Sequence, residues 1–353
     1  MKNRNRIRHL AFLLVTVFIL GALTACGPGG DTPAQPGTET ENVDGANAPA
    51  AKDKYVIGFS QTGTESEWVV AMSDEILASF AESDMFDLQF AESQAIQENQ
   101  IKTLRAYIQQ GVDLIVLRPT VTTGWDTVLM EAKEAGIPVI LAGRRVEMAT
   151  GDIEDYTLTY IGPDNIQAGE ALANTMINML AEEEKPANVV VLEGTVGASA
   201  ATERQTGIMN VLDNQEELVV YGSQSAEWTR TKGKEVMEAF LKSAAAEGTE
   251  IKGVLAHNDD MGLGAIQAIE EAGFKPGEDV ILMGVDGARG SFEAMVEGTY
   301  NATVENPLGY GPVLVELLEA YFKDGTIPET WVVLDNVVYT QDQAAAALPN
   351  RTW

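Results

Sequence analysis

Cysteine and histidine are nearly absent from this sequence of 353 residues. It contains one cysteine, Cys26, and two histidines, His9 and His257. One cysteine cannot form an internal disulfide, and so few sulfur and imidazole ligands give no zinc site of the usual kind. We therefore expect a fold that depends on its hydrophobic core alone, with no metal and no cofactor.

Basic residues are also few. The sequence has 23 Lys and Arg against 53 Asp and Glu, and residues 26–353 keep only 19 of the basic residues, for a net charge of −34. So acidic a chain does not bind nucleic-acid phosphates, and its charge opposes contact with anionic lipid headgroups. We expect no nucleic-acid partner, and any membrane attachment must come from a lipid.

Enzyme motifs are missing as well. The phosphate-binding pattern G-x-x-x-x-G-K-[ST] does not occur. The stretch Gly194-Thr195-Val196-Gly197 follows an expected strand, as a phosphate loop would, but it lacks the lysine and the full glycine pattern. No nucleophile or carboxylate pair stands out among the many acids. We therefore expect a binding protein and not an enzyme.

The first residues have the pattern of an export signal. The basic residues Lys2, Arg4, Arg6 and Arg8 come first. They are followed by an apolar run over 10–22, which is shorter than a membrane-spanning helix usually is. Leu23-Thr24-Ala25-Cys26 then resembles a bacterial lipobox. We expect a lipoprotein signal peptide over 1–25, lipidation of Cys26 and a flexible tether over 26–54. A plain signal peptide with an incidental cysteine is the alternative.

From Tyr55 onward, short apolar runs alternate with stretches of helical periodicity. The expected strands are 55–60, 86–91, 113–117, 139–142, 156–161, 188–192, 218–221, 251–255, 280–285, 301–304 and 331–339. The expected helices are 68–80, 96–110, 127–135, 166–183, 200–212, 232–246, 262–272, 292–297 and 312–322. This alternation predicts an α/β fold with parallel sheets. The strands are too many for one open sheet, so we expect two doubly wound halves.

Polar and aromatic residues gather directly after the expected strands, where ligands bind in doubly wound sheets. The candidates are Gln61, Glu65, Trp68, Arg144, Arg204, Trp228, Asn258, Asp286, Glu305 and Asn306. A sugar needs this mixture, because planar polar groups bind its hydroxyls and aromatic rings pack on its C–H faces.

Each candidate also has a purely structural interpretation. The two tryptophans suit a hydrophobic core, and the two arginines suit surface ion pairs. The run Asn258-Asp259-Asp260 stands where a strand ends and a helix begins, so its side chains could simply cap that helix. The joint placement of all candidates at strand ends favours a ligand site.

Several longer stretches match a known family as a set. They are 60–66 (SQTGTES) with Trp68, 98–102 (ENQIK), Gly124-Trp125, 193–199 (EGTVGAS), 232–238 (KGKEVME), 256–273 with Lys275-Pro276-Gly277, and Val285-Asp286-Gly287. With these motifs the chain resembles the sugar-binding proteins of bacterial ABC importers, in the ribose/galactose type, and most of all their galactofuranose-binding branch. The resemblance runs from about Tyr55 to Tyr339.

The resemblance implies the type I periplasmic binding fold, with two Rossmann-like lobes joined by a hinge of three segments. The N-terminal lobe would comprise 55–162 and 308–333, and the C-terminal lobe 163–307 and 334–353. The chain would cross between them near Gly162-Pro163, Pro307 and Leu334-Asp335.

The resemblance also implies a function. A monomer would capture a monosaccharide, galactofuranose-like or related, and deliver it to an ABC permease and its ATPase. It would be exported and held by its lipid at the outer face of the cytoplasmic membrane, or in the periplasm. The alternative is a sugar or signal receptor of the same fold that feeds a sensor kinase or chemoreceptor.

Residue by residue, the resemblance assigns the sugar contacts to Arg144, Arg204, Trp228, Asn258 and Asp286, with Glu305 or Asn306 adding a polar contact at a crossing. One position departs from the family. An aspartate that precedes the arginine after the fourth strand is replaced here by Gly143. This leaves open whether the ligand is a neutral sugar with a water in the gap, a sugar lacking one hydroxyl, or a sugar with a carboxylate.

Overall fold

The computed structural model describes residues 52–180 and 184–353. The predictions for the signal peptide and for Cys26 lie outside these residues. Within them, no helix is long and apolar enough to cross a membrane.

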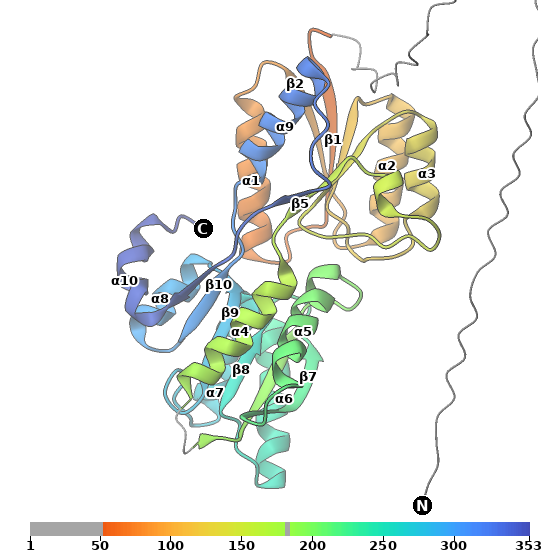
Figure 1. The fold of residues 1–353 in the computed structure, drawn as a ribbon. Coiled ribbons are helices and arrows are strands. Elements are labelled where there is room, and N and C mark those ends of the chain that lie inside the picture. The colour runs from red at the N-terminus through yellow and green to blue at the C-terminus, as the bar shows by residue number, and fades with distance from the viewer. Residues whose placement is uncertain (1–51, 181–183) are drawn as a thin grey trace, which may run out of the picture. The chain divides into compact units, whose positions relative to one another are not determined.

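Two six-stranded sheets organise the described chain (Figure 1). The first has the order β11-β5-β4-β3-β1-β2, and the second has the corresponding order β12-β10-β9-β8-β6-β7. Neighbouring strands are parallel except for the pair β10 and β12. We call each sheet with its helices a lobe, the first and the second. The prediction of two doubly wound α/β lobes is therefore confirmed.

The elements follow one another as strand and helix in both lobes. The first sheet contains β1 (Tyr55–Gln61), β2 (Phe86–Glu92), β3 (Leu114–Leu117), β4 (Val139–Ala142), β5 (Thr159–Gly162) and β11 (Trp331–Val333). Its helices are α1 (Glu67–Ala81), α2 (Gln97–Gln110), α3 (Asp126–Glu134) and α9 (Tyr310–Asp324), with the 3₁₀ turn η1 (Ile153–Asp155).

The second sheet contains β6 (Ala187–Glu193), β7 (Leu218–Ser225), β8 (Gly253–Ala256), β9 (Ile281–Asp286), β10 (Ala302–Glu305) and β12 (Val337–Thr340). Its helices are α4 (Asn165–Met179), α5 (Ser199–Leu212), α6 (Arg230–Glu247), α7 (Asp259–Glu271), α8 (Arg289–Glu297) and α10 (Gln341–Ala347), with the 3₁₀ turn η3 (Leu348–Asn350).

The central strands are buried on both faces, which explains their unbroken apolar sequences. In β3, Leu114 and Val116 pack into the layer under α1 and α9, whereas Ile115 and Leu117 pack into the layer under α2 and α3. Figure 1 shows these helix pairs on opposite sides of the first sheet. Each fully buried aliphatic side chain contributes about 1.5–3 kcal/mol of hydrophobic stabilisation, so such strands hold the lobe together.

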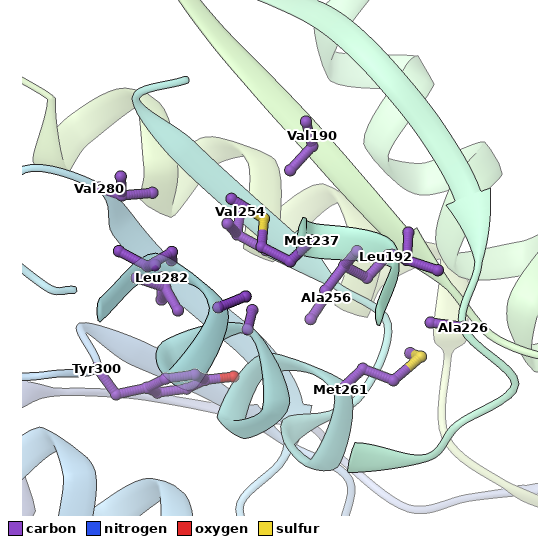
Figure 2. Close-up of a cluster of buried hydrophobic side chains, with 14 of the residues drawn as sticks. Val190, Leu192, Ala226, Met237, Val254, Ala256, Met261, Val280, Leu282 and Tyr300 are labelled. Carbon is purple, nitrogen blue, oxygen red and sulfur yellow. The ribbon is translucent and has the colours of Figure 1, made fainter. Parts of the chain in front are cut away.

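The second lobe has the same three-layer construction. Val190 and Leu192 of β6 face the cluster under α6, α7 and α8, which Figure 2 shows in close-up, and Val189 and Val191 face α4 and α5. In the figure, Met237 of α6 lies against Val254 of β8. The sheet is thereby fixed between two helical layers, and its strand ends remain free to present side chains to other contacts.

One expected element is wrong. The sequence predicts a single strand over 331–339, but β11 joins the first sheet and β12 joins the second. Leu334, Asp335 and Asn336 between them carry the chain from one sheet to the other. The chain also passes between the sheets after β5 and after β10, so three segments connect the lobes.

Candidate ligand-binding site

The strand order places the site. In each sheet the chain order reverses beside the first strand of the lobe, between β1 and β3 and between β6 and β8. Ligands bind outside the carboxyl ends of strands at such switch points. Glu65, Arg118 and Arg144 follow β1, β3 and β4, while Asn258 and Asp286 lie at the ends of β8 and β9. The ends of both sheets thus direct polar side chains to one region.

A small cavity occupies this region and takes its wall from both lobes. Its lining residues are Glu65, Ser66, Trp68, Val69, Arg118, Gly143, Arg144, Ala200, Arg204, Trp228, Asn258, Asp286 and Asn306. The structure therefore brings together all the candidates except Gln61 and Glu305. Only about 20 Å³ of the cavity is open to the centre of a water molecule, which is room for about one ordered water. A larger molecule can enter only if the walls separate.

A larger groove of about 680 Å³ opens beside the cavity and shares Glu65 and Ser66 with it. The charged side chains of its wall include two sets of ion pairs: Arg230 pairs with Glu67 and Asp260, and Arg289 pairs with Glu293. These charges already have partners and are half exposed for the most part. The small cavity, whose polar atoms are buried and partly unpaired, is the better candidate.

The first-lobe wall is built around Glu65. Its Oε1 accepts hydrogen bonds from Thr62 Oγ1 at 2.8 Å and from the guanidinium groups of Arg118 and Arg144, each at 3.3 Å. Burial raises the pKa of Glu65, but the two arginines together with hydrogen bonds from the backbone and Thr62 bring the pKa below its ordinary value. Glu65 is therefore a carboxylate at neutral pH and is shared between two cations.

The second-lobe wall is built around Arg204 of α5. Its Nε donates to Asn165 Oδ1 at 3.1 Å, and its Nη1 donates to the backbone oxygen of His257 and lies 3.9 Å from Asp286 Oδ1. Burial raises the pKa of Asp286 well above its ordinary value, although Arg204 acts in the opposite direction. The site thus holds a carboxyl group that is poorly solvated until a ligand donates to it.

Two tryptophans form the apolar part of the wall. The Trp68 ring has the Arg118 guanidinium 5.4 Å from its centroid, and its Nε1 donates to Asn306 O at 2.7 Å. The Trp228 ring has Arg144 at 5.5 Å and Arg204 at 5.7 Å from its centroid. Both rings are buried, and each belongs to the hydrophobic core of its lobe as well as to the cavity wall.

Trp228 reaches this position through an unusual backbone. Its φ is +66°, a value that non-glycine residues rarely adopt. A Cβ at Gly194 would lie 2.0 Å from the Trp228 ring. The glycine that made 194–197 look like a phosphate loop therefore provides space for the indole ring.

Asn258 is both a lining residue and a helix cap. Its Oδ1 accepts from Met261 N at 3.0 Å, and its Nδ2 donates to Trp228 O at 3.0 Å. The neighbouring aspartates have other roles. Asp259 accepts from Gly287 N and from further donors of the β9–α8 turn, and Asp260 accepts from Glu67 N of the first lobe at 2.9 Å. The capping interpretation holds for the asparagine and fails for the aspartates.

Two candidates point elsewhere. Gln61 Nε2 donates to Ser73 Oγ at 3.1 Å within the first lobe, and its Oε1 accepts from Thr62 N at 2.9 Å. Glu305 pairs with Arg351 near the C-terminus. The structure brings neither side chain to the cavity. Of the two residues expected to line it at the crossing after β10, only Asn306 does so.

Arg118 was missed at the sequence level. It directly follows β3 and is buried in the cavity wall, where its Nη1 donates to Thr62 Oγ1 at 2.5 Å. The rule that selected the other candidates, a polar side chain just past a strand, also applies to it. Among the described residues, no group of three or more His, Cys, Asp or Glu side chains is arranged to hold a metal ion.

Comparison with known proteins assigns the fold to a family. The family model described as "Periplasmic binding protein domain" matches residues 57–326. The chain belongs to this periplasmic binding protein family.

Relatives in this family are similar over most of their length. The galactofuranose-binding protein YtfQ of Escherichia coli (strain K12) is 43% identical over 298 residues, which are 84% of this chain and 91% of YtfQ. The crystal structure of a galactofuranose binding protein has a TM-score of 0.79 at 42% identity and covers 84% of this chain and 98% of its own.

A third relative is the binding protein of the arabinose ABC transporter from Shewanella sp. ANA-3, solved with α- and β-L-arabinofuranose. It has a TM-score of 0.78 at 40% identity and covers 84% of this chain and 95% of its own. The homologues are solute-binding proteins and not enzymes.

Proposed function

We propose that this periplasmic binding protein captures a monosaccharide, galactofuranose-like or related, in the cavity between its lobes and delivers it to an ABC importer. The observation that carries the proposal is the composition of the cavity wall. Two tryptophan rings from different lobes stand beside buried planar groups of Arg144, Arg204 and Asp286. Rings of this kind pack on sugar C–H faces, and such planar groups bind pairs of hydroxyls.

Unpaired buried atoms support the same proposal. Among the described residues, Glu65 Oε2, Arg144 Nε, Trp228 Nε1 and Asn306 Oδ1 have no hydrogen-bond partner. Buried polar atoms without partners are costly, so each is a position that a ligand hydroxyl can satisfy. The mixture of donors and acceptors suits hydroxyl groups, which can both donate and accept.

The test is a thermal-shift panel of pentoses, hexoses and furanoses on the purified protein. A sugar that binds only the folded state raises Tm by mass action, by an amount that grows with its concentration. Measured from each protein's own Tm without ligand, the variant Trp228→Ala should lose most of this shift. A panel in which no sugar raises Tm would refute the proposal.

We further propose that the protein is anchored by a lipid on Cys26, with 26–54 as its tether, and that the lobes are 55–162 with 308–333 and 163–307 with 334–353. The anchoring rests on the lipobox-like sequence alone. Cys26→Ala should move the protein from the membrane fraction to the soluble fraction. Retention of the variant in membranes at the wild-type level would contradict the anchor.

A further inference from the structure

Gly143 lines the cavity without a side chain, and we call the space that a Cβ would take there the gap at Gly143. An ideal Cβ built on Gly143 would lie 3.4 Å from Arg118 Nε and 3.4 Å from Tyr310 Oη. Both of these atoms are buried and have no hydrogen-bond partner among the described residues. Arg118 Nε can only donate, and Tyr310 Oη can donate as well. Two unsatisfied donors therefore face the same small space.

The net charge of the cavity wall also favours an acceptor with negative charge. Its charged members are Arg118, Arg144 and Arg204 on one side and Glu65 and Asp286 on the other, for a formal charge of +1. Each of the five side chains is at most 12% exposed. A buried charge without a partner is strongly unfavourable. The wall lacks one negative charge.

The two acids cannot supply that charge at the gap. Glu65 already lies between Arg118 and Arg144, and Asp286 lies beside Arg204. Glu65 Oε2 and Asn306 Oδ1 are unpaired acceptors of the same wall and are suited to ligand hydroxyls. The wall therefore offers acceptors for ligand hydroxyls and, beside Gly143, two donors for one acceptor group.

We propose that the preferred ligand is a sugar acid, and that its carboxylate occupies the gap at Gly143 and accepts hydrogen bonds from Arg118 Nε and Tyr310 Oη. This inference rests on the proposed sugar-binding function and specifies its ligand class. A carboxylate carries one negative charge and therefore neutralises the wall. A phosphate group carries about −1.5 to −2 at neutral pH and is bulkier, so it fits neither the charge nor the gap.

The acid–base behaviour of Arg144 agrees with this assignment. Burial, together with the neighbouring Arg118 and Arg204, lowers its pKa to about 9 in spite of Glu65. Burial is the largest cause of this shift, and repulsion from the two neighbouring arginines adds to it. A bound carboxylate would relieve that repulsion.

The experiment compares matched pairs of a neutral sugar and its acid by isothermal titration calorimetry. The pairs are D-galactose with D-galacturonate, D-glucose with D-glucuronate, D-ribose with D-ribonate and L-arabinose with L-arabinonate. In at least one pair the acid should bind about tenfold or more tightly than its neutral partner, as expected for a charge-assisted hydrogen bond gained at Arg118.

Two variants test the location. Gly143→Asp places the protein's own carboxylate in the gap, and aspartate is among the residues that best tolerate the positive φ of +71° found there. It should weaken the acid by about tenfold or more relative to the neutral partner. Arg118→Gln should weaken the acid more than the neutral sugar. Arg105→Gln removes an exposed charge that pairs with Glu131 outside the site and should change neither.

The outcomes separate the two proposals. If neutral sugars bind as tightly as their acids or more tightly, the sugar-acid inference fails and the proposed function stands. If Gly143→Asp weakens both members of a pair equally while Tm is unchanged, the carboxylate does not occupy the gap. If no sugar and no acid binds, the inference and the proposed function fail together.

Discussion

At the level of single residues, Asp286 in the cavity wall combines a strained backbone with a buried carboxyl group. Asp286 has a φ of +133°, which for a non-glycine residue costs about 1–3 kcal/mol. Its carboxyl group is 7% exposed and lies 3.9 Å from the guanidinium of Arg204. Asp286 therefore lowers the stability of the folded protein, and its place in the cavity wall indicates that it serves ligand binding instead.

Replacing Asp286 should therefore separate stability from binding. Asp286→Asn keeps the shape of the side chain but removes a charge that burial opposes, so Tm without ligand should stay the same or rise. Affinity for a sugar that binds the wild type should fall by about tenfold to a hundredfold, because charge-assisted hydrogen bonds contribute about 1.5–3 kcal/mol each. Calorimetry and thermal unfolding measure the two quantities.

Asp213→Asn is the matched control for this change. Asp213 is exposed at the end of α5 and lies outside the cavity. It should leave both affinity and Tm unchanged. If Asp286→Asn lowers Tm and leaves affinity intact, Asp286 is a structural residue and not a ligand contact.

His257 gives the stability a dependence on pH. Its Nδ1 accepts from Gly194 N at 3.3 Å, and its Nε2 lies 3.3 Å from Gln205 Oε1. Burial and the nearby Arg204 lower its pKa to about 3. The unfolded chain binds this proton near the ordinary pKa of 6.5, but the folded chain does not. The contribution of His257 is therefore present above pH 6.5 and is lost as pH falls from 6.5 towards 3.

Comparison with His257→Gln isolates this contribution. Glutamine can accept from Gly194 and donate to Gln205, but it does not titrate. Between pH 7.5 and 5.5 the wild type should lose roughly 1.4 kcal/mol more unfolding free energy than the variant. Denaturant unfolding at both pH values measures the difference, and acids such as Asp259 contribute equally to both proteins. Parallel pH profiles would contradict the assignment.

At the level of elements, close contact between helices fixes the second-lobe wall. Cβ atoms added at Gly169 of α4 and Gly207 of α5 would lie 2.1 Å from Arg204 O and 2.0 Å from Ile166 O. The two helices therefore touch backbone to backbone. Because Arg204 stands on α5 at this contact, the packing of the helix pair sets the position of its guanidinium.

Gly207→Ala should push α5 away from α4. The added methyl group has no space against a backbone atom, and such overpacking costs about 1–3 kcal/mol, so Tm should fall by several degrees. Affinity should fall as well, because Arg204 moves with the helix. Thr206→Ala, on the exposed face of the same helix, is the control and should change neither. A wild-type Tm for Gly207→Ala would show that the helices can separate freely.

Most elements of the fold could be predicted from the sequence, since apolar runs and helical periods alternate clearly. The division of 331–339 could not. Both halves of that stretch are apolar enough for a strand, and nothing local shows that Trp331 pairs with Tyr160 while Val337 pairs with Glu305. Sheet membership is decided by partners distant in the sequence.

The same limit applies to the site. Strand ends correctly indicated where polar side chains gather, but the direction of each side chain depends on the turn that follows the strand. Gln61 turns back to Ser73, and Glu305 turns to Arg351. Trp228 has a positive φ, which brings its ring to the cavity, but a tryptophan in the sequence does not indicate this backbone conformation. Which residues reach the ligand therefore required the structure.

At the level of the whole molecule, the lobes contact each other around the cavity. Thr122 N donates to Gly197 O at 2.7 Å, and Arg145 N donates to Ser199 Oγ at 2.7 Å. Glu67 N donates to Asp260 Oδ2 on the other side of the site. With room for about one water inside, the lobes are closed on each other in this conformation, and a sugar can enter only after they separate.

Once a sugar has entered the open form, its contacts with both walls should shift the protein towards closed conformations by rotation at the three crossings. The radius of gyration from solution scattering should decrease at saturating sugar. Tryptophan fluorescence should change as well, because Trp68 and Trp228 both line the cavity. A radius of gyration that is identical with and without saturating ligand would contradict a hinge motion.

Arg230 offers a way to weaken closure without touching the ligand. This second-lobe side chain pairs with Glu67 of the first lobe at 2.9 Å and with Asp260 of its own lobe at 2.8 Å, and it is 49% exposed. Exposed ion pairs contribute about 0.2–1 kcal/mol. Arg230→Met should lower the population of the closed state and so weaken apparent affinity by about fivefold at most.

The loss should appear mainly as faster ligand dissociation, because the pair forms only after the lobes meet. Salt screens exposed charges, so added salt should reduce the difference between wild type and variant. Arg105→Met removes an ion pair to Glu131 within the first lobe and provides the control. If Arg230→Met and Arg105→Met release ligand at the same rate, the contact between Arg230 and Glu67 does not hold the lobes together.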